Sequence, residues 1–269
     1  MNNTEKNIQN NIDLTILIVT FKERQIYVQD LIKKIKEADP VINIVLAVNG
    51  NNDEVIDEQY RKNMLALAHN TSNCYAFICP QFMSLPKLWN TLVLFSSTEY
   101  NFIICDDVEY GNKNIIKQIK EYISKSKEEF FTINGGFSHF VITKQMLHKL
   151  NYFDERLCGF GEEDGDIMHS FILKEKRELP MLYVANIYNK ALYSIKNEHI
   201  ETHCDNKPKF NREFIYKKYI DDALNGIRGM NPTPIRRILE DKQQYPYEMF
   251  IKNNKHNIKK FTEVIFNYE

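Results

Sequence analysis

Hydrophobic residues in the first part of the chain form two kinds of pattern, and these predict strands alternating with helices. Short continuous apolar runs, rich in β-branched residues, are typical of strands buried on both faces. Longer stretches with apolar residues every three or four positions predict helices. The alternation indicates an α/β fold with a mainly parallel sheet and right-handed crossovers. The predicted strands are residues 14–20, 42–48, 74–78 and 101–105, and the predicted helices are 24–38, 55–68 and 86–96.

The pattern becomes less regular in the second part of the chain. An acidic segment near residue 161 should begin a helix that runs to about residue 174. The other predicted elements are strands at 130–133, 137–142, 181–187 and 191–196, and a short helix at 144–150. We expect a flexible N-terminus over residues 1–12, a catalytic domain over 13–209 and a helical extension packed on it over 210–269.

Composition narrows the class of protein. The formal net charge of −1 gives no basic footprint for nucleic acid. Five scattered cysteines, without a CxxC pair, fit reduced thiols in the cytoplasm. The polar N-terminus lacks a secretory signal, and the apolar runs are too short to span a bilayer. We therefore expect a cytoplasmic protein.

Two acidic clusters are the main chemical signal. Residues 159–167 carry four carboxylates within five positions, directly after two glycines and a phenylalanine. Like charges this close cost stability unless a cation, a cationic ligand or a proton-transfer role compensates. The alternative is an acidic helix start favoured by the helix dipole. A second cluster, Asp106, Asp107 and Glu109, follows an apolar run. Together the two clusters favour a catalytic metal site.

Polar residues follow three of the predicted strands, at 20–24, 49–53 and 106–109. Ligands of parallel sheets bind beyond the carboxyl ends of strands, so this coincidence favours a nucleotide-type ligand. Asp107 and Glu109, spaced by one residue, could direct oxygens toward one Mg²⁺ or Mn²⁺. A solvated acidic turn is the alternative.

Basic residues and histidines could complete such a site. Lys22 and Arg24, at the first strand-to-helix junction, could neutralise a diphosphate with the help of a helix N-terminus. His199 and His203 lack the signature of a zinc site and lie in a segment that resembles a loop. We expect one of them, His203, to complete a carboxylate-bound metal site; ordinary surface histidines are the alternative.

The order of these motifs resembles that of GT-A glycosyltransferases, in particular the inverting β-1,4-galactosyltransferases and bacterial family 2 enzymes. Six motifs in the right order are more specific than any one of them. The matching segments are Thr20-Phe21-Lys22-Glu23-Arg24, Lys87-Leu88-Trp89-Asn90, Asp107-Val108-Glu109, Asn134-Gly135-Gly136-Phe137-Ser138, Phe160-Gly161-Glu162-Glu163-Asp164-Gly165-Asp166-Ile167 and His203-Cys204-Asp205-Asn206-Lys207.

The resemblance implies a GT-A fold and the transfer of a sugar, with inversion, from a UDP-sugar to a carbohydrate hydroxyl. It implies Asp164 as the base and Glu163 as a catalytic-site residue that hydrogen-bonds sugar hydroxyls. The implied cofactor is Mn²⁺ or Mg²⁺. The implied metal ligands are Asp107, Glu109 and His203; the donor-binding residues are Thr20, Phe21, Lys22, Arg24, Asn49, Lys87, Asp106, Asp107 and Gly136; and the acceptor- and sugar-binding residues are Phe160, Gly161 and Asp166.

The sequence departs from the family pattern at Glu109, Phe160 and Gly165. The two departures in the second cluster, Phe160 and Gly165, leave the transferred sugar and its acceptor open. The expected setting is bacterial surface polysaccharide or glycoconjugate synthesis. The lysines in residues 210–269 add a weak peripheral contact with the inner face of the membrane as a minor expectation.

Two other classes of protein remain as alternatives. A sugar-nucleotide pyrophosphorylase shares the strand–helix alternation, but such enzymes usually carry a glycine-rich loop after the first strand, where this chain has no glycine. A non-catalytic carbohydrate-binding protein does not need the full set of Asp107, Glu109, Asp164 and His203.

Overall fold

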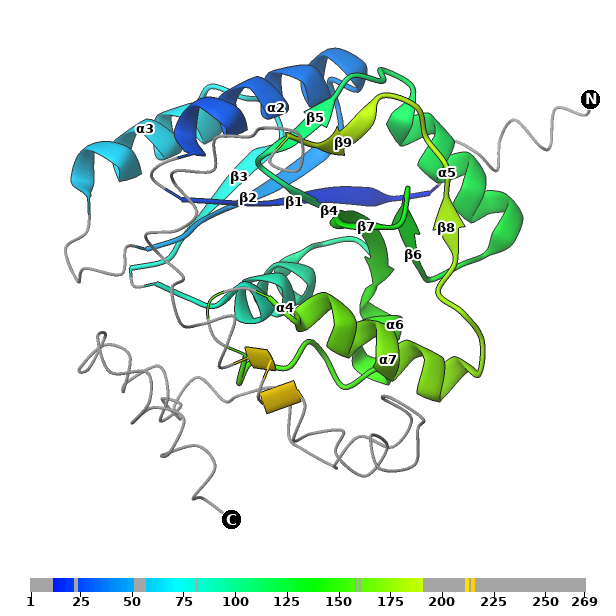
Figure 1. Cartoon of the computed structure of the whole chain (residues 1–269). Helices are drawn as coiled ribbons and strands as arrows, with labels where there is room; N and C mark the ends of the chain where they lie inside the picture. The colour runs from blue at the N-terminus through cyan, green and yellow to red at the C-terminus, as the bar shows by residue number, and fades with distance from the viewer. Residues whose placement is uncertain are drawn as a thin grey trace, which may run out of the picture.

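A computed structural model describes residues 12–21, 24–50, 57–80, 82–157, 159, 161–190, 211–212 and 214–215. Within this part of the chain, a central sheet lies between two layers of helices (Figure 1). No helix in the described ranges is long and apolar enough to cross a membrane.

The central sheet has seven strands in the order β3-β2-β1-β4-β7-β6-β8. Strands β3, β2, β1 and β4 are mutually parallel, whereas β7 runs antiparallel to both β4 and β6. The chain moves outward from β1 to β3 and then returns to place β4 on the other side of β1, so the strand order switches between β1 and β4. The strands are β1 (Leu14–Thr20), β2 (Asn43–Val48), β3 (Cys74–Ile78), β4 (Tyr100–Cys105), β6 (Phe130–Ile133), β7 (Gly136–Thr143) and β8 (Met181–Leu182).

Each face of the sheet has its own apolar core. Alternate residues of β1 enter opposite cores, as Ile16 and Leu17 do. Such burial on both faces is why these strands are nearly continuous apolar runs. On one face lie α2 (Gln25–Ala38), α3 (Glu58–His69) and α5 (Ile115–Ser126), and on the other lie α4 (Leu85–Phe95), α6 (Lys144–Lys149) and α7 (Glu163–Glu175) (Figure 1).

A small second sheet pairs β5 (Val108–Tyr110) antiparallel to β9 (Ile187–Asn189) beside α2 (Figure 1). Val108 and Tyr110 are buried in the same core as α2, whereas Glu109 between them is only half-buried. The backbone N–H of Lys190 donates to the carbonyl of Asp107 at 2.9 Å. This ribbon therefore fixes the chain directly after the end of β4.

The structure confirms most of the predicted elements, with boundaries that move by a few residues. Two elements were not predicted: α5, which has an apolar face of isoleucines, and β5, where the sequence suggested a metal-binding turn. The strand predicted over 181–187 is instead two short strands, β8 and β9, because the chain turns at Asn186, whose φ is 59°. The predicted strand at 191–196 lies outside the described residues.

Candidate active site

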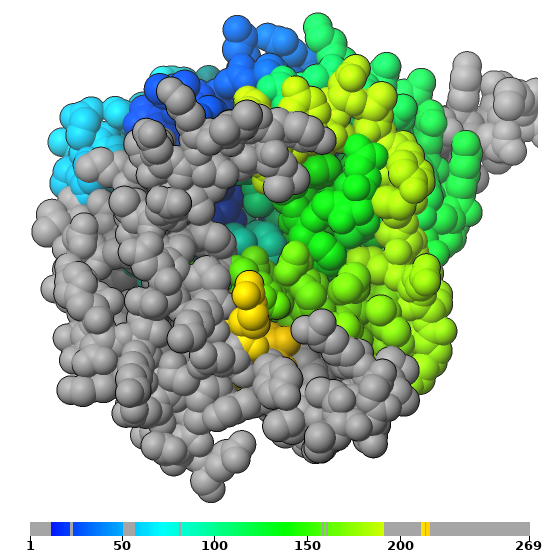
Figure 2. Space-filling view, viewed as in Figure 1, coloured from blue at the N-terminus to red at the C-terminus, as the bar shows by residue number. Residues whose placement is uncertain are grey.

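The carboxyl ends of β1 and β4 meet where the strand order switches, which is where ligands of open α/β sheets bind. Thr20 ends β1 and is buried, and Asp106 and Asp107 follow β4 directly and are also buried. Figure 2 shows a hollow in the surface here, with blue atoms from around β1 and teal atoms from around α4 and β4 at its floor. The two strand ends predicted to contribute to one site are thus neighbours.

Arg24 connects the two strand ends electrostatically. One guanidinium nitrogen lies 3.0 Å from Asp106 Oδ1 and 2.8 Å from Asp107 Oδ2. The guanidinium also lies over the ring of Phe21, 4.8 Å from its centroid. Burial lowers the pKa of Arg24, but the charges of Asp106 and Asp107 outweigh that effect and raise the pKa above its ordinary value. Arg24 therefore stays charged and holds both carboxylates at the end of β4.

The two aspartates differ in their surroundings. Burial raises the pKa of Asp106 to about 7; Arg24 lowers it and the charge of Asp107 raises it. Asp107 Oδ1 is buried without a hydrogen-bond partner in the described part of the chain. A buried carboxylate oxygen without a partner costs free energy, so this atom is suited to an additional cationic ligand.

Glu109 has partners of its own, away from this pair. Its carboxylate lies 2.6 Å from the ammonium of Lys34 on α2 and 3.1 Å from that of Lys190. These lysine contacts lower the pKa of Glu109. Both carboxylate oxygens thus have a cationic partner, and no group of three or more His, Cys, Asp or Glu side chains placed to hold a metal occurs among the described residues. The pairing of Asp107 with Glu109 around one metal therefore stays a prediction, in which Glu109 would have to exchange a lysine partner for the metal.

Three further donor-site candidates lie near the strand ends. The side-chain amide of Asn49 is engaged on both sides by the backbone of Met83, at 2.9 Å each, so it fixes the loop before α4. Lys87 lies half-buried in the first turn of α4. Gly136 begins β7, which runs alongside the end of β4, and a Cβ there would approach the ring of His139 to 3.2 Å. Asn49 therefore has a structural role that the sequence did not reveal.

The second acidic cluster forms the start of α7. Gly161 and Glu162 both have positive φ, 102° and 73°, and Glu162 is the residue that precedes the helix. Glu163 is buried, and its Oε2 has no hydrogen-bond partner among the described residues. Burial raises the pKa of Glu163 to about 8, and the charges of Asp164 and Glu162 act in the same direction. Glu163 is therefore a carboxyl group that the fold holds protonated at neutral pH.

Cys105, the last residue of β4, lies within electrostatic reach of both acidic clusters. Burial raises the pKa of its thiol well above the usual value. The charges of Asp107 and Asp106 raise it further, and so does the charge of Glu163. The start of α7 therefore lies within electrostatic reach of the Asp106–Asp107 pair.

The other acidic residues of α7 have contrasting environments. Asp164 is exposed and accepts a hydrogen bond from the backbone N–H of Gly165 at 2.8 Å. Asp166 is fully buried, and its backbone carbonyl accepts a hydrogen bond from the Ser170 hydroxyl at 3.0 Å. A carboxylate that must take a proton from an incoming group has to be accessible, and Asp164 is accessible whereas Asp166 is not.

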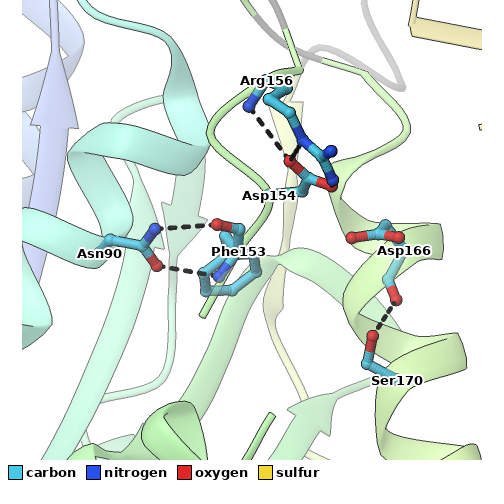
Figure 3. A network of polar contacts seen from close by, with 6 residues as sticks. All are labelled: Asn90, Phe153, Asp154, Arg156, Asp166 and Ser170. Carbon is cyan, nitrogen blue, oxygen red and sulfur yellow. Dashed lines mark hydrogen bonds and ion pairs between the residues drawn. The ribbon is translucent and has the colours of Figure 1, made fainter. Parts of the chain in front are cut away.

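The segment before α7 is supported by side chains that were not predicted as functional. Asn90 on α4 binds both the N–H and the carbonyl of Phe153, at 3.0 and 2.9 Å (Figure 3). Its amide also donates to Glu155. Arg156 forms a two-point ion pair with Asp154 in the same segment (Figure 3). The sequence gives one sign of this role, because Asn90 is a polar residue among the apolar positions of a predicted helix.

Three predicted site residues, Lys22, Phe160 and His203, lie outside the described residues. The structure therefore leaves their roles as predictions.

No protein-family model matches the sequence, and no curated protein matches it. Solved structures do match the fold. The S. aureus protein TarS is 13% identical, with a TM-score of 0.51, over 66% of this chain and 60% of its own. A mannosyltransferase of Pyrobaculum calidifontis, in complex with GDP-mannose and Mn²⁺, is 9% identical, with a TM-score of 0.51, over 64% of this chain and 54% of its own.

A third match aligns over more of both chains. Glucosyl-3-phosphoglycerate synthase of Mycobacterium tuberculosis, in complex with Mn²⁺, UDP-glucose and phosphoglyceric acid, is 8% identical, with a TM-score of 0.57. The alignment covers 78% of this chain and 81% of the synthase. The protein has a GT-A fold. The mixed, mainly parallel sheet of this GT-A protein confirms the fold class expected from the sequence.

Proposed function

We propose that this GT-A protein transfers a sugar from a nucleoside diphosphate, UDP in our expectation, to a hydroxyl group of a carbohydrate. The observation that carries the proposal is the ion-pair cluster of Arg24 with Asp106 and Asp107, which lies where the strand order switches between β1 and β4. The acidic start of α7 is the second cluster. One cluster contains buried carboxylates held by an arginine, and the other presents an exposed carboxylate on the first turn of a helix. The fold is shared with the sugar-nucleotide complexes of the mannosyltransferase and the synthase, which supports the same substrate class.

A divalent cation fits the first cluster. Asp107 Oδ1 is a buried carboxylate oxygen with no hydrogen-bond partner among the residues that the structure describes, and hard carboxylate oxygens suit Mn²⁺ or Mg²⁺. We assign the metal to Asp107, with His203 as a further expected ligand, and we assign Glu109 to holding β5 against α2. When bound, such a cation would neutralise the diphosphate of the donor. The mannosyltransferase and the synthase were both solved with Mn²⁺, which favours this metal.

The protein's own residues would then perform three tasks. Arg24, charged and directed toward the strand ends, adds positive charge where the departing diphosphate gains negative charge. Glu163, held protonated, can donate a hydrogen bond to a sugar oxygen. Asp164, exposed at the start of α7, can take the proton of the acceptor hydroxyl as that oxygen attacks.

The transfer that we propose is a direct displacement. The acceptor oxygen forms a bond to the anomeric carbon while the bond from that carbon to the diphosphate oxygen breaks. The acceptor proton goes to Asp164, and the bonding electrons leave with the diphosphate. Attack from the face opposite the leaving group inverts the anomeric configuration, as the motif resemblance implies. The expected setting is bacterial surface polysaccharide or glycoconjugate synthesis in the cytoplasm, with a weak inner-membrane contact as a secondary expectation.

A donor panel tests this function. The protein would be incubated with UDP-glucose, UDP-galactose, UDP-N-acetylglucosamine or GDP-mannose, each with Mn²⁺, Mg²⁺ or a chelator, and with mixed mono- and oligosaccharide acceptors. We expect release of the nucleoside diphosphate from one donor, abolished by the chelator. Pyrophosphate release from UTP plus a sugar phosphate would instead establish a pyrophosphorylase. Carbohydrate binding with no turnover of any donor would establish a binding protein.

A further inference from the structure

One turn of helix from the C-terminal region packs against the loop that begins α7. This C-terminal turn consists of Asn211, Arg212, Phe214 and Ile215, all helical. It follows the start of α7 by about fifty residues in sequence, yet it lies beside that loop in space. In Figure 2 its gold atoms lie at the rim of the hollow. The sequence alone assigned this region to packing.

Asn211 binds the loop at its most unusual backbone position. Its side-chain amide donates to the carbonyl of Gly161 at 2.8 Å, and the residue is fully buried. Gly161 and Glu162 are consecutive residues with positive φ, and Glu162 lacks the freedom of glycine. Such conformations persist only where the surrounding structure determines them. Among the described residues, no atom would lie within 4 Å of a Cβ on Gly161, so the packing of these residues does not fix the loop at that position.

Two further contacts connect the C-terminal turn with the same segment. The buried ring of Phe214 lies under the guanidinium of Arg156, 4.9 Å from ring centroid to Cζ. Arg212, which is largely exposed, lies 3.4 Å from Glu162. A cation–π contact at a buried ring is worth more than an exposed ion pair, so Phe214 and Asn211 provide most of the attachment.

The other end of the loop is held from α4. The backbone N–H of Leu85, the first residue of α4, donates to the carbonyl of Gly159 at 2.7 Å. The loop is therefore fixed at two carbonyl groups, those of Gly159 and Gly161, by two elements that are distant from each other in sequence. The α4 contact holds the Gly159 end of the loop, and the Asn211 contact holds the Gly161 end, directly before α7 begins.

We propose that Asn211 is a positioning residue for the reaction: its hydrogen bond to Gly161 sets the bend that places Asp164 at the mouth of the donor site. The effect on catalysis through Asp164 rests on the proposed function, whereas the effect of Asn211 on the bend at Gly161 does not. A displacement of about 1 Å in a catalytic group can cost about a hundredfold in rate, so even a small relaxation of this bend would be visible in turnover. The donor side, built from the ends of β1 and β4, would be unaffected.

The test replaces Asn211 by leucine, which keeps the approximate size and removes the donor. Asn101→Leu is the matched control, because Asn101 is also fully buried and its amide donates to a backbone carbonyl, that of Glu99, at 2.9 Å. Asn101 lies near the amino end of β4, whereas the site lies at the carboxyl end of the same strand. Three quantities would be measured: amide hydrogen exchange over residues 159–166, the Kd for UDP with Mn²⁺, and the kcat of donor turnover.

In Asn211→Leu we expect faster exchange confined to residues 159–166, a UDP affinity within about twofold of the parent, and a kcat lower by about tenfold to a hundredfold. Asn101→Leu should leave the exchange of this loop and kcat unchanged. Parent-like exchange and parent kcat in a folded Asn211→Leu protein would overturn the proposal. An equal loss of UDP binding and turnover would also overturn it, because it would show a general effect on the fold.

If Asn211→Leu does not fold, Phe214→Leu provides the second variant, because it removes the ring under Arg156 and keeps an apolar side chain. We expect the same local increase in exchange. Loss of folding in both variants, with Asn101→Leu folded, would contradict a local positioning role. If the parent turns over none of the donors, the proposed function fails, and the exchange measurement still decides whether Asn211 sets the loop.

Discussion

The two acidic clusters of this protein differ in how the fold compensates their charge. In the cluster after β4, Arg24 pairs with Asp106 and Asp107, and Lys34 and Lys190 pair with Glu109. At the start of α7, Glu163 is buried and forms no ion pair within the described residues. Its burial raises its pKa to about 8 instead.

This difference indicates different tasks for the two clusters. Carboxyl groups that are paired with cations at a strand end can hold a metal and, through it, a diphosphate. Carboxyl groups at the start of a helix, one protonated and one exposed, suit hydrogen bonding to a sugar and proton transfer. A carboxyl group whose pKa is raised by its surroundings, as that of Glu163 is, is typical of sites of acid–base chemistry.

The largest effect is expected from replacing Arg24, the cation that pairs with Asp106 and Asp107 in the cluster after β4. Arg24→Ala would leave two adjacent buried carboxylates without their partner. Because removing one partner of a buried ion pair leaves an uncompensated charge, we expect the free energy of unfolding to fall by about 3 kcal/mol. We also expect the Kd for UDP to rise by about tenfold or more. Urea denaturation and calorimetric titration with UDP would measure these two changes.

Arg177→Ala is the matched control. Arg177 also binds a carboxylate, that of Glu128, at 2.9 and 2.6 Å, and also lies over a phenylalanine ring, but it is 43% exposed. Its loss should cost less than about 1 kcal/mol and leave UDP binding unchanged. Equal effects of the two substitutions would show that Arg24 is an ordinary surface cation.

An intermediate effect concerns the proton on Glu163. The pKa of this residue is raised from 4.5 in the unfolded chain to about 8 in the folded protein. Between these values the folded state binds one more proton than the unfolded state, so stability falls as pH rises. Glu163→Gln cannot titrate, so its unfolding free energy relative to the parent should grow with pH by up to about 1.4 kcal/mol per unit between about pH 5 and about pH 7.5.

Denaturation of the metal-free proteins at a series of pH values would measure this difference. Burial also raises the pKa of Asp106, to about 7. Asp106 therefore makes the unfolding free energy fall with pH in both proteins, and this contribution cancels in the comparison. A constant difference between variant and parent over this pH range would mean that Glu163 is already ionised in the folded state.

The smallest effect is expected at Glu109. Its ion pairs with Lys34 and Lys190 are partly exposed, so Glu109→Gln should cost about 1 kcal/mol or less. The Mn²⁺ concentration for half-maximal donor turnover should stay within about twofold of that of the parent. A loss of metal dependence as large as that of Asp107→Asn would return Glu109 to the metal site.

The sequence predicted that residues after β1 and β4 would be neighbours, and the structure places them so for a clear physical reason. Parallel strands buried on both faces are continuous apolar runs, and the residues after them must meet at one edge of the sheet. The proximity of Thr20, Arg24, Asp106 and Asp107 could therefore be predicted from local pattern, and their role in donor binding stays a prediction. The ion pairs of Glu109 could not be predicted in this way, because a three-residue strand, β5, directs its carboxylate to two lysines from distant parts of the chain.

The second acidic cluster and the loop before α7 could be predicted from the sequence only in part. The acidic motif and the helix that it begins were predicted, but the supports of the loop were not. Asn90, Leu85 and Asn211 reach it through hydrogen bonds to backbone groups, which carry no sequence periodicity. Which carboxyl group is buried also depends on tertiary packing: Glu163 is buried and its neighbour Asp164 is exposed.

Asp164→Asn tests the division of labour between the clusters most directly, with Asp107→Asn measured beside it. Asparagine can still accept the hydrogen bond from the Gly165 N–H, but it cannot take the acceptor proton. The account predicts that Asp164→Asn binds UDP with Mn²⁺ like the parent while its transfer rate falls by about a hundredfold or more. Asp107→Asn should instead lose both metal-dependent UDP binding and transfer. A folded Asp164→Asn protein that binds UDP with Mn²⁺ and transfers sugar at the parent rate would contradict the account.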